Sequence, residues 1–235
     1  MLHVFSGPAA SHTVVIDTER RAYCWGRNEE GQLGLGDTVN RYAPTAVLPG
    51  ERIKSGACGP NHTMLFTTMG ALFAAGANGS GQLGTGLAHS KTAFVRIEGM
   101  VEVVSVACGR EFTAAVNADG EVYTWGHPEH GQLGNGGEYK TLEKAGKWTY
   151  QLTKHPTKVD ALLGVSVATV CAGPNHTAVS RGLPVPGAVG LLLCVCVCVC
   201  VGVDAGVRCW VLRWVGWVSP LFPFSLFFAG STPWH

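Results

Sequence analysis

The sequence has little excess charge of either sign. Its 235 residues carry 17 Lys and Arg against 16 Asp and Glu, a formal net charge of +1. Residues 1–181 hold 15 basic and 15 acidic residues without a block of Lys or Arg. Because binding to nucleic acid or to an anionic membrane through a basic patch needs such a block, the composition gives no electrostatic footprint for either.

Targeting and disulfide signals are also lacking. The first residues, MLHVFSGPAASH, contain no basic region followed by an apolar run, so we expect no secretory signal. Residues 1–181 contain only the scattered cysteines Cys24, Cys58, Cys108 and Cys171. This usage suits a reducing compartment, where Cys serves as a small buried apolar residue.

Catalytic motifs are missing as well. No Ser, Cys or Lys lies in a G-x-S-x-G or similar turn, and the acidic residues are scattered singly. We therefore predict no enzyme activity, no catalytic residue, no cofactor and no metal.

Glycine, in contrast, is abundant, with 32 residues, and it marks an internal repeat. The word GQLG recurs in steps of 50, at residues 31–34, 81–84 and 131–134. A second word recurs as ACGPNHT at 57–63, ACGREFT at 107–113 and CAGPNHT at 171–177. Periods of 40–50 residues indicate propeller blades or helical arrays.

The local pattern favours blades. Residues 113–126 form two alternating runs around Asp-Gly, a hairpin signal, and residues 101–109 form a β-branched run stopped by Gly. No window shows a sustained 3.6-residue apolar period with helix caps. We predict an all-β partial β-propeller of three to three and a half blades over residues 1–179, with repeats 5–54, 55–104 and 105–166 and a stub at 167–179.

These words resemble the regulator of chromosome condensation repeat family over residues 5–179. The shared pattern includes Cys58-Gly59…His62-Thr63, Asp119-Gly120…Trp125-Gly126 and Trp25-Gly26…Gly31-Gln32-Leu33-Gly34. The resemblance implies a seven-bladed propeller in the nucleus or on the cytoskeleton. It also implies action on small GTPases, as an exchange factor or as a scaffold.

Residues at equivalent repeat positions are expected to serve the scaffold. No Lys-Ser/Thr follows the glycines Gly31, Gly34, Gly81, Gly84, Gly131 and Gly134, so a phosphate-binding loop is disfavoured. His12, His62 and His176 occupy one slot that the third copy fills with Phe112. An imidazole needed for proton transfer or metal ligation would not be replaced by phenyl, so we predict packed core histidines.

Two metal sites stay as weaker alternatives. Cys58 with His62, and Cys171 with His176, could supply zinc ligands, but Cys108 has no partner His and paired Cys-x-x-Cys spacing is absent. The segment HPEH at 127–130 allows a loose metal contact.

Partner selection is expected in the variable loops beside GQLG, because propeller loops form the faces on which partners dock. The insertion 135–160 adds five lysines, and it includes Trp148 and Tyr150, side chains of the kind found in interface anchors; a long solvated loop is the alternative. The candidate partner contacts are Arg27, Asn28, Glu29, Glu30, Glu129, His130, Lys144, Lys147, Trp148 and Tyr150.

Residues 180–235 form an apolar tail of a different composition. The stretch CVCVCVCV at 194–201 could be a strand with all thiols on one face, and residues 187–203 are 17 uncharged residues, short for a membrane helix. A translated intron fits more residues: a GT tract encodes alternating Val and Cys, and PLFPFSLFF at 220–228 can be written wholly in pyrimidines. We favour the intron hypothesis.

The sequence thus predicts a protein-interaction propeller of the small-GTPase regulator type, linked by resemblance to mitosis and the cytoskeleton. A non-catalytic scaffold is one alternative. A truncated product without function, or tethered to a membrane through 187–203, is another.

Overall fold

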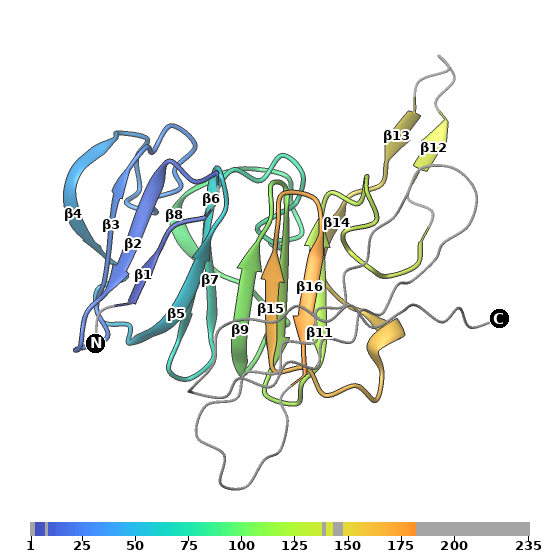
Figure 1. Ribbon diagram of the computed structural model, residues 1–235. Helices are drawn as coiled ribbons and strands as arrows, with labels where there is room; N and C mark the ends of the chain where they lie inside the picture. Colours follow the sequence, from blue (N-terminus) through green and yellow to red (C-terminus); the bar gives the residue numbers. More distant parts are fainter. Residues whose placement is uncertain (1–2, 8, 138–139, 143–147, 182–235) are drawn as a thin grey trace, which may run out of the picture.

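The computed structural model describes residues 3–7, 9–137, 140–142 and 148–181 (Figure 1). In these ranges the chain is built almost entirely of β-strands, with one short 3-10 turn, η1 (Asp160–Leu162). None of the described helices is long and apolar enough to cross a membrane. The predicted tail 180–235 lies outside the described residues except for its first two, and the segment 187–203 lies wholly outside them.

Three four-stranded antiparallel sheets follow one another along the chain, and each has its strands in sequence order. The first sheet contains β1 (His3–Phe5), β2 (His12–Ile16), β3 (Ala22–Gly26) and β4 (Arg41–Val47). The second contains β5 (Ile53–Cys58), β6 (His62–Thr67), β7 (Leu72–Gly76) and β8 (Lys91–Arg96). The third contains β9 (Val103–Cys108), β10 (Phe112–Asn117), β11 (Val122–Gly126) and β14 (Thr153–Lys158).

Two small sheets complete the described structure. A hairpin of β12 (Lys140–Leu142) and β13 (Trp148–Tyr150) lies within the loop between β11 and β14. A fourth sheet pairs β15 (Thr169–Ala172) with β16 (Thr177–Ser180). The prediction of an all-β chain is confirmed, whereas the predicted repeat boundaries stay a prediction.

The predicted Asp-Gly hairpin is present between β10 and β11. Val116 pairs with Val122, and the connecting turn closes with Gly120 N–H donating to the Asn117 carbonyl at 3.0 Å. Gly120 has φ +79°, a backbone conformation that favours glycine over residues with a Cβ. The turn therefore follows directly from the local sequence.

The sheets stand side by side, and the first strands of neighbouring sheets lie next to each other (Figure 1). Strands β5 and β9 contact each other, as do β9 and β15, whereas β4, β8 and β14 form the opposite edges of their sheets. This arrangement is part of a β-propeller, with the first strand of each sheet on the inside.

Each apolar cluster lies between two neighbouring sheets. Val14, Ile16 and Cys24 of the first sheet pack with Ile53 and Leu65 of the second. The second and third sheets share a further cluster, as do the third and fourth. All six residues of β6 and of β10 are buried, whereas β2 alternates buried with partly exposed residues. Burial on both faces thus requires a sheet on each side.

A hydrogen-bonded chain crosses the first junction between sheets. His12 Nε2 lies 2.7 Å from Thr63 Oγ1, and this hydroxyl donates to the Gln32 carbonyl at 2.7 Å. The single hydroxyl proton goes to the carbonyl, so the imidazole must donate through Nε2. Its Nδ1 then carries no proton, and it has no hydrogen-bond partner within the described structure.

The second junction repeats this chain with His62, Thr113 and Gln82. His62 Nε2 lies 3.1 Å from Thr113 Oγ1, which donates to the Gln82 carbonyl at 2.7 Å. At the third junction Thr177 still donates to the Gln132 carbonyl at 2.8 Å, but Phe112 offers no imidazole.

Two residues of the fourth sheet, His176 and Cys171, are exposed, although the sequence predicted that they are buried. His12 and His62 are buried, but His176 is exposed, because the described chain places no further sheet over it. Cys24, Cys58 and Cys108 are buried free thiols, and burial raises the pKa of Cys58 to about 12. Cys171 is exposed, so the expectation of four buried thiols is wrong for this residue.

The buried histidines should make stability depend on pH below 6.5. Burial lowers the pKa of His12 from 6.5 to about 4 and that of His62 to about 3. Between these values and 6.5 the unfolded chain binds more protons, so the contribution is complete above pH 6.5 and is lost as pH falls. We expect about 1.4 kcal/mol per pH unit for each histidine, measured by urea unfolding between pH 6.5 and 5.

The third repeat supplies the control. His62→Phe gives the second repeat the phenylalanine that the third repeat carries as Phe112. This variant should remove roughly one of the two histidine contributions to the pH dependence of the unfolding free energy. An unchanged slope in the double variant His12→Phe/His62→Phe would contradict this assignment.

Candidate partner-binding face

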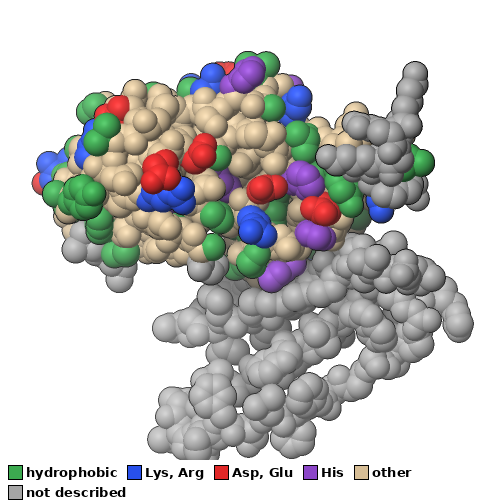
Figure 2. Space-filling model, turned by 90° about the horizontal axis from the view of Figure 1, so that it is seen from above, with side chains coloured by type: hydrophobic (Ala, Val, Ile, Leu, Met, Phe, Trp, Pro, Cys, Tyr) green, Lys and Arg blue, Asp and Glu red, His purple; other side chains and the backbone are tan. Residues whose placement is uncertain are grey.

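The GQLG loops follow β3, β7 and β11 and lie at one end of the sheets (top of Figure 1). We call this end the upper face, and it comprises the described residues of the loops 27–40, 77–90 and 127–152. Figure 2 looks down on this face and shows acidic, basic and histidine side chains spread across it. Loops between the first two strands of each sheet reach the same end, because those strands run antiparallel to one another.

The GQLG word forms two consecutive turns. Gly31 N–H donates to the Asn28 carbonyl and Gly34 N–H to the Gly31 carbonyl, each at 2.9 Å. Gly34 has φ +68°, and a Cβ there would overlap the Phe94 ring. The remaining four glycines of the repeated word also have positive φ: Gly81, Gly84, Gly131 and Gly134. The glycines shape the turns and allow close packing.

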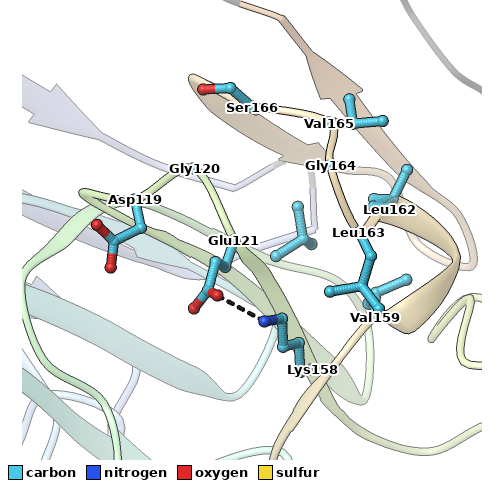
Figure 3. A pocket seen from close by; sticks show the side chains of 11 residues that line it. Asp119, Gly120, Glu121, Lys158, Val159, Leu162, Leu163, Gly164, Val165 and Ser166 are labelled. Atoms are coloured by element: carbon cyan, nitrogen blue, oxygen red, sulfur yellow. Dashed lines mark hydrogen bonds and ion pairs between the residues drawn. The ribbon is translucent and has the colours of Figure 1, made fainter.

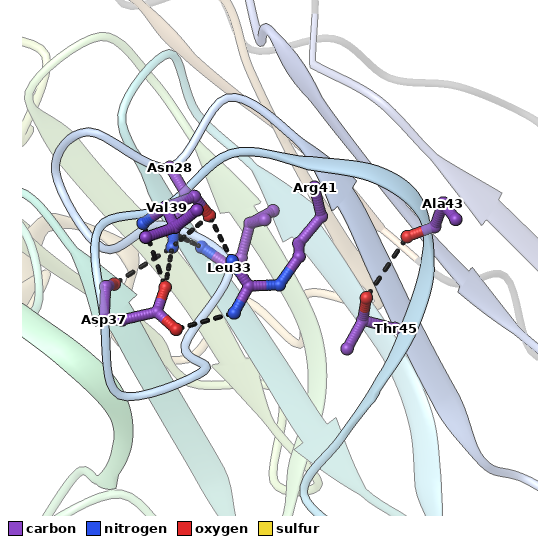
Figure 4. A network of polar contacts seen from close by, with 7 residues as sticks. All are labelled: Asn28, Leu33, Asp37, Val39, Arg41, Ala43 and Thr45. Atoms are coloured by element: carbon purple, nitrogen blue, oxygen red, sulfur yellow. Dashed lines mark hydrogen bonds and ion pairs between the residues drawn. The ribbon is translucent and has the colours of Figure 1, made fainter.

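Asn28 holds the first loop together from inside (Figure 4). Its side chain is fully buried; Oδ1 accepts the Leu33 N–H at 2.9 Å, and Nδ2 donates to the carbonyls of Asp37 and Val39. Arg41 pairs with Asp37 at 2.6 Å and holds the pKa of that carboxyl below its usual value. The expectation that Asn28 contacts a partner is therefore corrected, because this side chain has no exposed surface.

The second loop repeats the arrangement and the third does not. Asn78 Oδ1 accepts the Leu83 N–H at 3.0 Å, and its Nδ2 donates to the carbonyls of Leu87 and His89. The third loop carries Pro128 at this position, which has no side-chain amide. This is the loop that contains the β12–β13 hairpin.

A polar hollow of about 270 Å³ opens on the upper face where the third sheet meets the fourth. Glu129 Oε2 lies 3.9 Å from His127 Nδ1 and 3.8 Å from His130 Nε2. The Tyr150 ring lies against His127, with 5.4 Å between ring centroids. The lining residues are Arg110, Glu111, His127, Glu129, His130, Gln132 and Asn175.

The predicted contacts divide into two groups. Arg27 and Glu29 form an exposed ion pair on the first loop, beside the half-buried Glu30. On the third loop, Glu129 and His130 line the hollow.

The structure brings Tyr150 to the same hollow through His127, whereas other predicted contacts are less well placed. Lys144 and Lys147 lie outside the described residues, and Trp148 is described only as part of the β13 backbone. Tyr150 is therefore the one described aromatic side chain that the insertion contributes near the hollow.

Arg110 and Glu111 are lining residues that sequence reasoning missed. They replace Pro60-Asn61 of the second repeat and Pro174-Asn175 of the fourth. The signal was present in the repeat alignment, because two charged residues stand where the second and fourth copies have Pro-Asn and the first has Ala10-Ser11.

Within the described ranges, no three His, Cys, Asp or Glu residues are grouped so as to hold a metal ion. The buried Cys58 thiol donates weakly to the Phe5 carbonyl at 3.8 Å. The zinc alternative and the loose metal contact at 127–130 therefore have no described ligand group.

A second cavity, of about 260 Å³, lies at the opposite end of the third sheet (Figure 3). Lys158 pairs with Glu121 at 2.5 Å and holds the pKa of that carboxyl below its usual value. Leu162 and Leu163, from the η1 segment, line the other side. The Lys158–Glu121 ion pair links β14 to the β10–β11 hairpin, and we assign this ion pair a structural role.

Adjacent four-stranded sheets with fixed inter-sheet contacts define a repeat-type β-propeller. The Regulator of chromosome condensation (RCC1) repeat matches residues 21–66, 69–116 and 119–180, and a second form of that repeat matches 103–132. The chain belongs to the regulator of chromosome condensation repeat family.

Curated relatives include regulator of chromosome condensation 2 proteins. Protein RCC2 of Homo sapiens is 50% identical over 60 residues, and the Danio rerio homolog is 48% identical over 60 residues. The matching stretch is 25% of this chain and 12% of each relative.

Solved structures share the fold. Human WBSCR16 gives a TM-score of 0.63 at 24% identity, covering 76% of this chain and 44% of that one. Prp20p of Saccharomyces cerevisiae, described with its binding properties to Gsp1p and histones, gives 0.64 at 21% identity, covering 75% of this chain and 42% of that one. Yeast RCC1 (Prp20) bound to Kap60 gives 0.60 at 26% identity, covering 74% and 40%. The partial-propeller prediction is confirmed, and the chain spans less than half of these propellers.

Replacing Asn28 tests its role inside the loop. Asn28→Ala removes every hydrogen bond that the Asn28 side chain makes and leaves the buried Leu33 N–H without its acceptor. We therefore expect a loss of about 2–3 kcal/mol in unfolding free energy. Chemical denaturation measures the loss, and amide exchange at Leu33 localises it. Glu29→Ala, at the exposed neighbour, serves as control and should change stability by less than about 0.5 kcal/mol; equal losses in both variants would contradict the anchoring role.

Proposed function

We propose that this chain presents a protein-binding face of the small-GTPase regulator type, formed by the upper-face loops. The observation that carries the proposal is the hollow of the third repeat, where charged and aromatic side chains converge on a scaffold that is otherwise repetitive. Loops held by a rigid sheet framework are where propellers recognise partners. Family membership and the fold shared with Prp20p, which binds Gsp1p, support a small GTPase as the partner class.

A regulator of this type needs no nucleotide site of its own. It changes the nucleotide affinity of the GTPase by binding its open state more tightly than its closed state. The side chains needed are partner contacts, and Arg27, Glu29, Glu30, Glu129, His130 and Tyr150 supply them in our proposal. A nuclear or cytoskeletal location, with a link to mitosis, belongs to the same proposal.

Binding and nucleotide release together test the proposal. Purified full-length chain is titrated with Gsp1p carrying fluorescent GDP. Binding with faster GDP release supports the regulator, binding without faster release supports the non-catalytic scaffold, and absence of binding contradicts the GTPase assignment.

A charge reversal tests the face. Glu129→Lys should weaken binding about tenfold, equivalent to about 1.4 kcal/mol, because it reverses a charge at the centre of the proposed contact. Asp119→Asn changes an exposed carboxylate at the opposite end of the same sheet and should leave affinity within about twofold. Equal effects of the two substitutions would place the interface elsewhere.

A further inference from the structure

The third repeat departs from its neighbours at the upper face, and the departures converge on one place. The second repeat carries Pro60, Asn61, Ala77, Gly79 and Ser80 at positions where the third is ionisable. The third repeat carries at these positions Arg110, Glu111, His127, Glu129 and His130, and all five line the hollow.

The fold does not require these charges. The two upper-face loops of each repeat are joined by one backbone hydrogen bond: Ala77 N–H to the Asn61 carbonyl at 2.8 Å in the second, and His127 N–H to the Glu111 carbonyl at 2.9 Å in the third. The second repeat keeps this geometry with uncharged side chains. Because this join does not account for the grouped charges, we look for their role in binding.

The carboxylates are incompletely paired. Glu111 accepts one hydrogen bond, from the Ser80 hydroxyl at 3.2 Å, and Glu129 has only the two histidines near 3.8–3.9 Å. Arg110 has no described carboxylate partner; its backbone N–H donates to the Pro174 carbonyl at 3.0 Å. The described lining thus holds two carboxylates against one guanidinium, which disfavours an anion and favours a cation.

Gln132 adds a hydrogen-bond donor to the hollow. Its side chain is only 4% exposed and lines the hollow, and its Oε1 accepts the His130 N–H at 2.7 Å. Its Nε2 donates to no group of the described chain. This amide is therefore available to donate to a carbonyl of an incoming segment.

We infer that the hollow of the third repeat binds a peptide segment of a partner protein through an arginine side chain. The planar guanidinium matches the two carboxylates Glu111 and Glu129 through its several N–H donors, the Tyr150 ring beside His127 offers an aromatic neighbour, and Gln132 Nε2 donates to the peptide backbone. This inference rests on the proposed protein-binding function and names the chemistry of the partner at that site.

The experiment uses a small probe and the histidine signals. Nα-acetyl-arginine methylamide is titrated into the full-length chain while the ring C–H resonances of His127 and His130 are followed by NMR. We expect saturable shifts of both rings and a dissociation constant at least fivefold tighter than for Nα-acetyl-citrulline methylamide, which has the same shape without the charge. Equal affinity for the two probes, or no saturable shift, overturns the inference.

Variants taken from the chain itself give the matched control. Glu111→Asn/Glu129→Gly installs the residues of the second repeat and should weaken probe binding at least tenfold with an unchanged melting temperature. Glu111→Gln/Glu129→Gln preserves size and should weaken it similarly, so loss in both identifies charge as the cause. Full probe affinity in the Gln variant overturns the inference.

The two proposals can fail separately. Selective arginine binding without binding to Gsp1p supports the hollow and contradicts the GTPase assignment. Binding to Gsp1p that is unaffected by Glu111→Gln/Glu129→Gln supports the GTPase assignment and overturns the role of the hollow in it.

Discussion

The structure depends on the burial of each sheet face by the next sheet. Strands β6 and β10 are buried along their whole length because they have a sheet on both sides, whereas β2 is buried only on alternate residues. The histidine–threonine–carbonyl chains act across the same junctions and fix how one sheet sits on the next. Stability in such an array is therefore shared between neighbours rather than held within a blade.

This dependence separates scaffold from recognition. Glycines and asparagines of the loops are committed to turns and to backbone groups, as Asn28 and Asn78 show. A side chain occupied in this way cannot change without loosening the loop. Positions whose side chains are free of these bonds vary between repeats at less cost, and the exposed loop residues Arg27 and Glu29 are examples.

The 50-residue period predicted the sheets because equivalent positions must meet equivalent neighbours. Pattern alone could not place Asn28, since a loop asparagine between charged residues reads as surface until the chain is seen to wrap around it. Nor could it show that His176 and Cys171 are exposed, because burial at these positions comes from an adjacent sheet rather than from the strand itself. The hollow was equally hidden, as Arg110 and Glu129 are 19 residues apart and meet only through β-pairing.

The third repeat shows how an array acquires a distinct site. Pro128 replaces the asparagine that ties the other two loops, and the same loop carries the β12–β13 hairpin, so loss of the internal tie accompanies added length. Phe112 replaces the imidazole at the adjoining junction, yet Thr177 keeps its bond to the Gln132 carbonyl. The third repeat thus keeps the backbone arrangement but lacks the side-chain hydrogen bonds that the asparagine and the histidine make in the other repeats. In this repeat Arg110, Glu111 and Glu129 place charge around the hollow, and this is the surface to which our proposal assigns a partner segment.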